Sequence, residues 1–213
     1  MKGLLIKDLL VLRRYGRVMA LLLVFYGAFA LLGNGGAAMS GMIAVVLAMT
    51  AVTSIAYDEQ ARWDRYACSL PVRRSQAVGA KYLLGLILTL TGCVPGLLIG
   101  LAAIAAGRQS WAELAGSLIG SFSGAVLLLA LMFPLIYRFG VEKSRILFLA
   151  ILAGTGAVIA AAALTLSEPR MGTLSAVRLV WLKLAAVAAP VLSLLIYGAS
   201  FGLSRRIYGK KEL

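Results

Sequence analysis

The residues that could do chemistry are concentrated in one polar segment, residues 57–82 (YDEQARWDRYACSLPVRRSQAVGAKY). It holds three of the eight acidic and five of the 21 basic residues of a chain that is otherwise strongly apolar. Asp58 and Arg62 are four residues apart and can pair on a short helix that also presents Trp63. Pro71 would end that helix. A short helix of this kind is suited to docking a soluble partner that does the chemistry.

The aromatic side chains of this segment allow a second interpretation. Trp63 and Tyr66 can share a helix face with Leu70. Aromatic residues in such positions also anchor membrane proteins at the level of the lipid headgroups. Docking of a partner and anchoring in the membrane are both compatible with these residues.

Catalysis by this chain is disfavoured by what its sequence lacks. There is no histidine, which removes the usual metalloprotease, serine-protease and haem-ligand arrangements. Neither Cys68 nor Cys93 is accompanied by other metal-ligating residues at a suitable spacing, and a structural disulfide between them is not expected. The nucleotide-binding pattern G-x-x-x-x-G-K-[ST] does not occur, and no apolar run has an acidic residue near its centre, as ion-coupled pumps commonly need. We therefore expect no catalytic residue, metal or cofactor in this chain.

The composition indicates that lipid surrounds most of the chain. Of its 213 residues, 62% are hydrophobic and 14% charged, with a mean hydropathy of +0.95, which is more apolar surface than one soluble core could bury. We therefore predict an all-α, polytopic membrane protein with a single domain over residues 1–213. Its six predicted transmembrane helices lie at about 16–32, 38–57, 82–106, 113–137, 146–166 and 180–203.

The basic residues predict the orientation. All but four of the 21 lie before or at the very start of the first span, between the second and third, between the fourth and fifth, or after the sixth. Because basic residues are enriched in cytoplasmic loops, both termini are predicted to be cytoplasmic. The net charge of +13 then reflects this asymmetry and an attraction to membrane lipids, and nucleic-acid binding is disfavoured because the basic residues are split among four segments. The four exceptions are Arg108, Arg170, Arg178 and Lys183.

The amino-terminal segment, residues 1–15, has an amphipathic pattern. Its leucines can share a broad apolar arc, which predicts a helix lying along the cytoplasmic membrane surface. An ordinary solvated lead-in to the first span is the alternative, and a cleaved secretory signal is disfavoured by the five spans that follow. The polar side of this helix would hold Lys2, Lys7, Asp8, Arg13 and Arg14.

Glycines recur every fourth residue in the third and fourth predicted spans. At this spacing they fall along one helix face and let a neighbouring backbone approach closely. We favour tight packing within the bundle over a substrate path or a seam between two chains. The positions are Gly92, Gly96, Gly100, Gly116, Gly120 and Gly124.

Several features together resemble the short permeases of ABC-2 type transporters. They are the amino-terminal MKGLLIKDLLVLRR, the acidic pair Asp58 and Glu59, Trp63, the run Ser69-Leu70-Pro71-Val72, the basic pair Arg73-Arg74, and Lys81-Tyr82. The resemblance implies the fold of ABC-2, or type V, exporters, with an amphipathic connecting helix before the first span and a cytoplasmic coupling helix between the second and third. The residues it assigns to coupling are Asp58, Glu59, Arg62, Trp63, Asp64, Arg65, Tyr66 and Leu70.

The resemblance also implies partners and a location. A separately encoded ABC ATPase would bind ATP and Mg²⁺ and dock below the membrane. Two permease chains would pair, as a homodimer or with a sister permease, in the inner or plasma membrane of a bacterial cell.

The cargo is suggested by relatives and by the apolar character of the spans. Relatives of this kind export phenol-soluble modulins and peptide antibiotics, which implies export of amphipathic peptides or hydrophobic compounds. One alternative is an ABC-2 exporter of lipid or polysaccharide precursors. Others are the substrate-capture subunit of an energy-coupling importer and a membrane enzyme or assembly factor without a partner ATPase.

Overall fold

The computed structural model describes residues 2–13, 16–32, 36–63, 74–151, 153 and 175–210, and their regular structure is entirely helical. The all-α prediction is confirmed for these ranges. Residues 141–151 form a helical segment that follows the last of the long central helices. The other helices are α1 (Lys2–Arg13), α2 (Gly16–Leu32), α3 (Gly36–Gln60), α5 (Arg74–Ala105), α6 (Trp111–Phe139) and α8 (Ser175–Gly209).

Three described helices are long and apolar enough to cross a membrane: Met42–Gln60, Arg74–Ala105 and Trp111–Phe139. They correspond to the second, third and fourth predicted spans, and the shorter apolar helix Gly16–Phe29 corresponds to the first. The fifth predicted span lies mostly outside the described residues, and the sixth coincides with part of α8. The chain is therefore a membrane protein with three supported spans, and the count of six stays a prediction.

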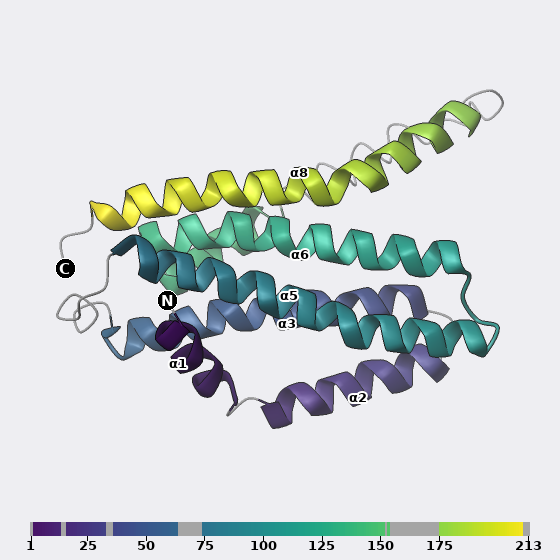
Figure 1. The fold of residues 1–213 in the computed structure, drawn as a ribbon, viewed down its shortest axis with the longest axis horizontal. Coiled ribbons are helices and arrows are strands. Elements are labelled where there is room, and N and C mark those ends of the chain that lie inside the picture. The colour runs from purple at the N-terminus through teal and green to yellow at the C-terminus, as the bar shows by residue number, and fades with distance from the viewer. Residues whose placement is uncertain are drawn as a thin grey trace.

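The long helices run along one common direction, and α1 lies at an angle to them near the end where both termini are found (Figure 1). Helix α3 packs on α5, and α6 contacts both of them as well as α8. Helix α2 lies against α3 and α5, while α1 contacts the same two helices. The α5–α6 connection lies at the opposite end of the bundle (Figure 1). The end that holds both termini is the one that the charge pattern assigns to the cytoplasm.

Helix α6 has clear signals at both ends. At its start, the Ser110 hydroxyl accepts a hydrogen bond from the Glu113 backbone N–H at 3.3 Å, and the Glu113 carboxylate accepts one from the Ser110 N–H at 3.0 Å. This reciprocal capping box satisfies two backbone donors that a helix terminus otherwise leaves free. At its end, Gly140 has a φ of +80°, a conformation that glycine adopts readily.

The two glycine rows have different surroundings. A Cβ at Gly92 would lie 2.7 Å from the Cα of Ala44, and one at Gly100 would collide with the Leu114 side chain. Helix α5 therefore approaches α3 closely at Gly92, and Gly96 is buried as well. In the described part of the chain, nothing lies within 4 Å of a Cβ placed on any glycine of the α6 row, which consists of Gly116, Gly120 and Gly124.

An aromatic cluster fixes the start of α5 against α6 and α8. The Tyr82 ring lies 4.7 Å from that of Phe133 and 4.8 Å from that of Tyr197, measured between centroids. The Tyr82 hydroxyl lies within hydrogen-bonding distance of Ser200 and Ser204, at 2.8 and 2.7 Å. Because buried aromatic pairs and satisfied hydroxyls both favour one packing arrangement, this cluster holds the residue next to Tyr82, Lys81, in a defined place.

Candidate functional site

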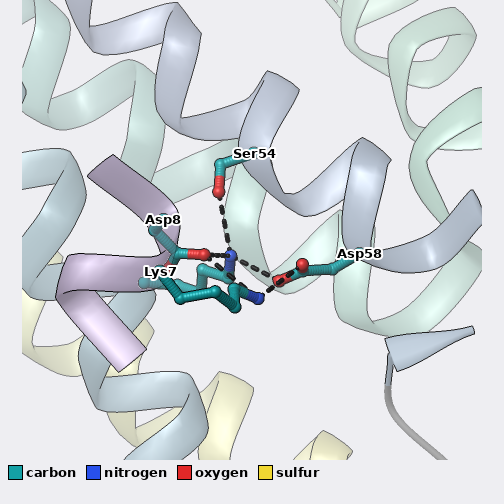
Figure 2. A network of polar contacts seen from close by, with 5 residues as sticks. Lys7, Asp8, Ser54 and Asp58 are labelled. Atoms are coloured by element: carbon teal, nitrogen blue, oxygen red, sulfur yellow. Dashed lines mark hydrogen bonds and ion pairs between the residues drawn. The ribbon is translucent and has the colours of Figure 1, made fainter. Parts of the chain in front are cut away.

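Four charged side chains of alternating sign meet where α1, α3 and α5 converge (Figure 2). The Nζ atom of Lys7 lies 2.6 Å from Asp58 Oδ1 and 3.2 Å from Asp8 Oδ1. The Nζ atom of Lys81 lies 2.8 Å from Asp8 Oδ1 and 2.5 Å from Asp58 Oδ2. Each lysine thus contacts both aspartates. We call these four residues the charge ring, and their formal charges cancel.

The charge ring is largely shielded from solvent. The side chain of Asp8 is 2% exposed and that of Lys81 is 11% exposed. Lys81 also donates a hydrogen bond to the Ser54 hydroxyl at 2.9 Å, one turn before Asp58 on α3. Removing one partner from a buried ion pair leaves an uncompensated charge, whereas removing a whole pair is often tolerated. We infer that the ring serves mainly to specify how α1 sits on α3 and α5.

Helix α1 presents its polar and apolar residues to different surroundings. Asp8 is buried in the charge ring and Lys7 is 25% exposed, because both pair with charged residues of α3 and α5. The exposed residues of α1 include Ile6 and Leu10, at 56% and 59%. A helix lying on the membrane surface would place such apolar residues in the lipid, and this location of α1 stays a prediction.

The end of α3 also differs from the expected short helix. Helix α3 continues to Gln60, so Asp58 belongs to its last turn and pairs with the two lysines of the ring. Arg62, the partner expected from local spacing, is exposed, with a φ of +50° in the turn that ends α3. A non-glycine residue in this left-handed region is uncommon and marks a sharp change of chain direction.

Trp63 follows that turn and is joined to the charge ring. The Nζ atom of Lys7 lies 4.1 Å from the centroid of the Trp63 ring, within the range of a cation–π interaction. The tryptophan is therefore held against α1, and only part of its surface is accessible. The small cavity of about 50 Å³ beside it is lined by the charge ring and by apolar residues such as Ile55, Val78 and Ile136.

Glu59, the neighbour of Asp58, contacts a different element. Its carboxylate accepts a hydrogen bond from the backbone N–H of Val141 at 2.8 Å. Two adjacent acidic residues of α3 thus reach separate parts of the structure: Asp58 reaches α1 and α5, and Glu59 reaches the start of the helical segment 141–151.

The remaining predicted site residues are only partly covered by the structure. Arg13, at the end of α1, is exposed, and Lys2 begins that helix. Outside the described residues lie Arg14 in the amino-terminal segment and Asp64, Arg65, Tyr66 and Leu70 in the expected coupling helix.

Sequence reasoning missed Lys81 and Ser54 as members of the site. Lys81 was counted as a basic residue of the connection between two spans and, with Tyr82, as part of the family resemblance, but not as a member of the site. The available signal was its place directly before a long apolar run, because a lysine at such a position needs either water or an acidic partner. Nothing in the sequence distinguishes Ser54 from the other hydroxyl residues of the same span.

The charge ring favours a mechanical role over a catalytic one. Both aspartates are paired with lysines, so they offer neither a free general base nor an open cation site. Among the described residues, no group of three or more His, Cys, Asp or Glu side chains could hold a metal ion. What the arrangement can do is transmit a displacement of one element to the two others.

Comparison with known proteins adds one finding. The family model described as "ABC-2 family transporter protein" matches residues 3–209. The matched range contains the whole charge ring, Trp63 and the three helices long enough to span a membrane. No curated protein and no solved structure matches the chain.

Proposed function

The chain belongs to the ABC-2 family of transporter proteins, and from this we propose that it is the permease subunit of an ATP-driven exporter. A separate ABC ATPase would hydrolyse ATP and dock on the polar segment between α3 and α5. The observation that carries the proposal is the connection of Trp63, through Lys7, to a charge ring that joins three helices. A partner that moves Trp63 would therefore move membrane helices.

The proposed coupling surface has two parts. The first consists of Asp58, Glu59 and Arg62 at the end of α3, where Asp58 and Glu59 are bound to other helices of the bundle. The second part follows in the sequence and holds the residues that would contact the ATPase. We propose that these are Trp63, Asp64, Arg65, Tyr66 and Leu70.

Replacing Trp63 by alanine is expected to weaken binding of the partner ATPase while leaving membrane insertion intact. A partly exposed aromatic at the centre of an interface contributes about 2 kcal/mol, or about thirtyfold in affinity. The measurement is co-purification and titration of the ATPase encoded with this chain, together with ATP-driven transport. Trp63→Phe should retain part of the affinity, because a phenyl ring still receives the Lys7 cation.

A matched control for Trp63 is available at the other end of the bundle. Trp111 begins α6 and is 68% exposed, so Trp111→Ala removes the same side chain far from the proposed interface. It should leave ATPase binding unchanged. Normal binding by Trp63→Ala would contradict the docking role and favour the alternative in which Trp63 anchors at the lipid headgroups.

A second permease chain is the other proposed partner. Tight packing of chain against chain requires helix faces with small residues. The α6 face with Gly116, Gly120 and Gly124 is open within the described part of the chain, and so are Gly198 and Gly202 of α8. These faces are available to a second copy or to a sister permease.

The proposed cargo is an amphipathic peptide or a hydrophobic compound. In α6, the charged residues lie near the ends, at Glu113 and Arg138, and α5 has its charges in the first turns, at Arg74 and Lys81. A hydrophilic solute crossing between such helices would lose its hydration without replacement, at about 2 kcal/mol or more for each unpaired polar group. Molecules that partition into the inner leaflet avoid this cost, which also favours export.

Amphipathic peptides are expected to stimulate ATP hydrolysis by the assembled complex in lipid vesicles. Hydrolysis should rise with peptide concentration and saturate, and deletion of the genes for the permease and its ATPase should sensitise cells to such compounds. The control is a scrambled peptide of equal composition that cannot form an amphipathic helix. Stimulation by a lipid-linked glycan, with no response to any amphipathic peptide, would instead support export of lipid or polysaccharide precursors.

A further inference from the structure

We propose that Glu59 is a positioning residue that joins the end of α3 to the helical segment 141–151, so that these two elements move as one unit. This inference rests on the proposed function, because it specifies how a displacement at the coupling surface would spread. The charge ring connects α3 to α1 and α5. Glu59 adds a connection to an element that the ring does not touch.

The contact has the chemistry of a helix cap supplied by a distant residue. The first backbone N–H groups of a helix have no partner within it, and a carboxylate there also interacts favourably with the helix dipole. Glu59 Oε2 accepts the hydrogen bond of the Val141 N–H at 2.8 Å, although the two residues are 82 positions apart in the sequence. The residue directly before this helical segment is Gly140, which has no side chain with which to form the cap locally.

The Glu59 carboxylate lies close against the backbone of Gly140. A Cβ at Gly140 would lie 2.7 Å from Glu59 Oε1, so any larger residue would displace the carboxylate. Its φ of +80° is also unfavourable for residues with a side chain. The Gly140 N–H donates to the Ile136 carbonyl at 2.9 Å, which ties this turn to the end of α6. The turn between α6 and the next helical segment is thus built to receive Glu59.

Two adjacent residues in the last turn of α3 therefore hold three other elements of the structure. Asp58 holds α1 and α5, and Glu59 holds the segment 141–151. Gln60 and the turn through Arg62 follow directly and lead to Trp63. A force applied at Trp63 would therefore be transmitted to α1 and α5 through Asp58, and to the segment 141–151 through Glu59.

Spin labels can test the link in the permease alone. Gln60 and Arg145 are both exposed and line the same groove of about 430 Å³ beside the contact. Labels at these two positions, in a chain carrying Cys68→Ser and Cys93→Ser, report the distance between α3 and the segment. In lipid nanodiscs, the unmodified chain should give a narrow distribution of label-to-label distances. Glu59→Ala should raise the population of molecules in which the segment 141–151 is detached from α3 about fivefold, the typical effect of losing a helix cap. Glu59→Gln should keep the narrow distribution, because its amide oxygen still accepts the Val141 N–H.

Two further variants make this measurement decisive. Glu142→Ala removes an exposed carboxylate that lines the same groove and should leave the distribution unchanged. Gly140→Ala displaces the Glu59 carboxylate by a different route and should broaden the distribution as Glu59→Ala does. An unchanged distribution in both Glu59→Ala and Gly140→Ala would overturn the proposal.

The complex with the ATPase separates this inference from the proposed function. At an ATPase concentration that saturates binding, stimulation of ATP hydrolysis by peptide should fall in Glu59→Ala in proportion to the detached population that the spin labels measure. Glu59→Gln should restore the stimulation. If no chain binds an ATPase, the proposed function fails while the spin-label result stands. If the ATPase binds and all variants are stimulated equally, the positioning role of Glu59 is wrong and the proposed function stands.

Discussion

Replacing Lys81 by methionine is expected to destabilise the folded chain by about 3 kcal/mol, because it leaves two aspartates with one lysine in a poorly solvated site. Asp8 is the most affected, since its side chain is 2% exposed and its 2.8 Å contact with Lys81 is lost. Methionine keeps the length of the side chain, so the change tests charge rather than volume. The measurement is the midpoint and free energy of unfolding of the purified protein in detergent.

A second substitution shows whether the ring acts as a unit. Adding Asp8→Asn to Lys81→Met leaves the Lys7–Asp58 pair, at 2.6 Å, with balanced charge. The double variant should therefore be more stable than the sum of the two single effects predicts, by about 1 kcal/mol or more. Lys143→Met is the matched control, because Lys143 is an exposed lysine outside the ring. Strictly additive effects of the two substitutions would show that Asp8 and Lys81 are not energetically coupled in the ring.

Replacing Gly92 by alanine is expected to cost about 2 kcal/mol, because one methyl group must be inserted where two helix backbones touch. The new Cβ would lie 2.7 Å from the Cα of Ala44 and 3.3 Å from its carbonyl oxygen. Neither is the end of a flexible side chain, so α3 and α5 would have to move apart. Unfolding in detergent measures the loss, and disulfide cross-linking between the two helices measures the displacement.

The same substitution at Gly120 provides the control, because its expected effect on stability is zero or of the opposite sign. Nothing in the described chain lies within 4 Å of a Cβ at Gly120, so alanine should leave the isolated chain unchanged or stabilise it by up to about 1 kcal/mol through helix propensity. A larger side chain at Gly120 should matter only where a second permease covers this face. Equal destabilisation by Gly92→Ala and Gly120→Ala would contradict the close approach of α3 and α5.

Much of the fold follows from local sequence features. Apolar runs of bilayer length predicted the helices around 38–57, 82–106 and 113–137, and all three are present as apolar helices of sufficient length. The residues that carry the resemblance to ABC-2 permeases also predicted the family, which the family model matching residues 3–209 confirms. Such features can be read from the sequence because they depend on neighbours within a few positions of the chain.

The candidate site could be predicted only in part, because its contacts are distant in sequence. Lys7 and Asp58 are 51 positions apart, and Asp8 and Lys81 are 73 apart. Local spacing paired Asp58 with Arg62 instead. Helix α3 continues past the expected boundary, and its last turn presents Asp58 to two lysines on other helices.

The two glycine rows show most clearly which features the sequence determines and which only the tertiary structure determines. The spacing in α5 and in α6 is identical, and each row was expected to pack inside the bundle. Gly92 meets a neighbouring backbone, whereas Gly120 meets nothing in the described chain. The helical period determines which residues share a face, and this much the sequence alone decides. Which neighbour that face meets depends on how all the helices pack together, because the free energy of each contact is set by residues far away along the chain.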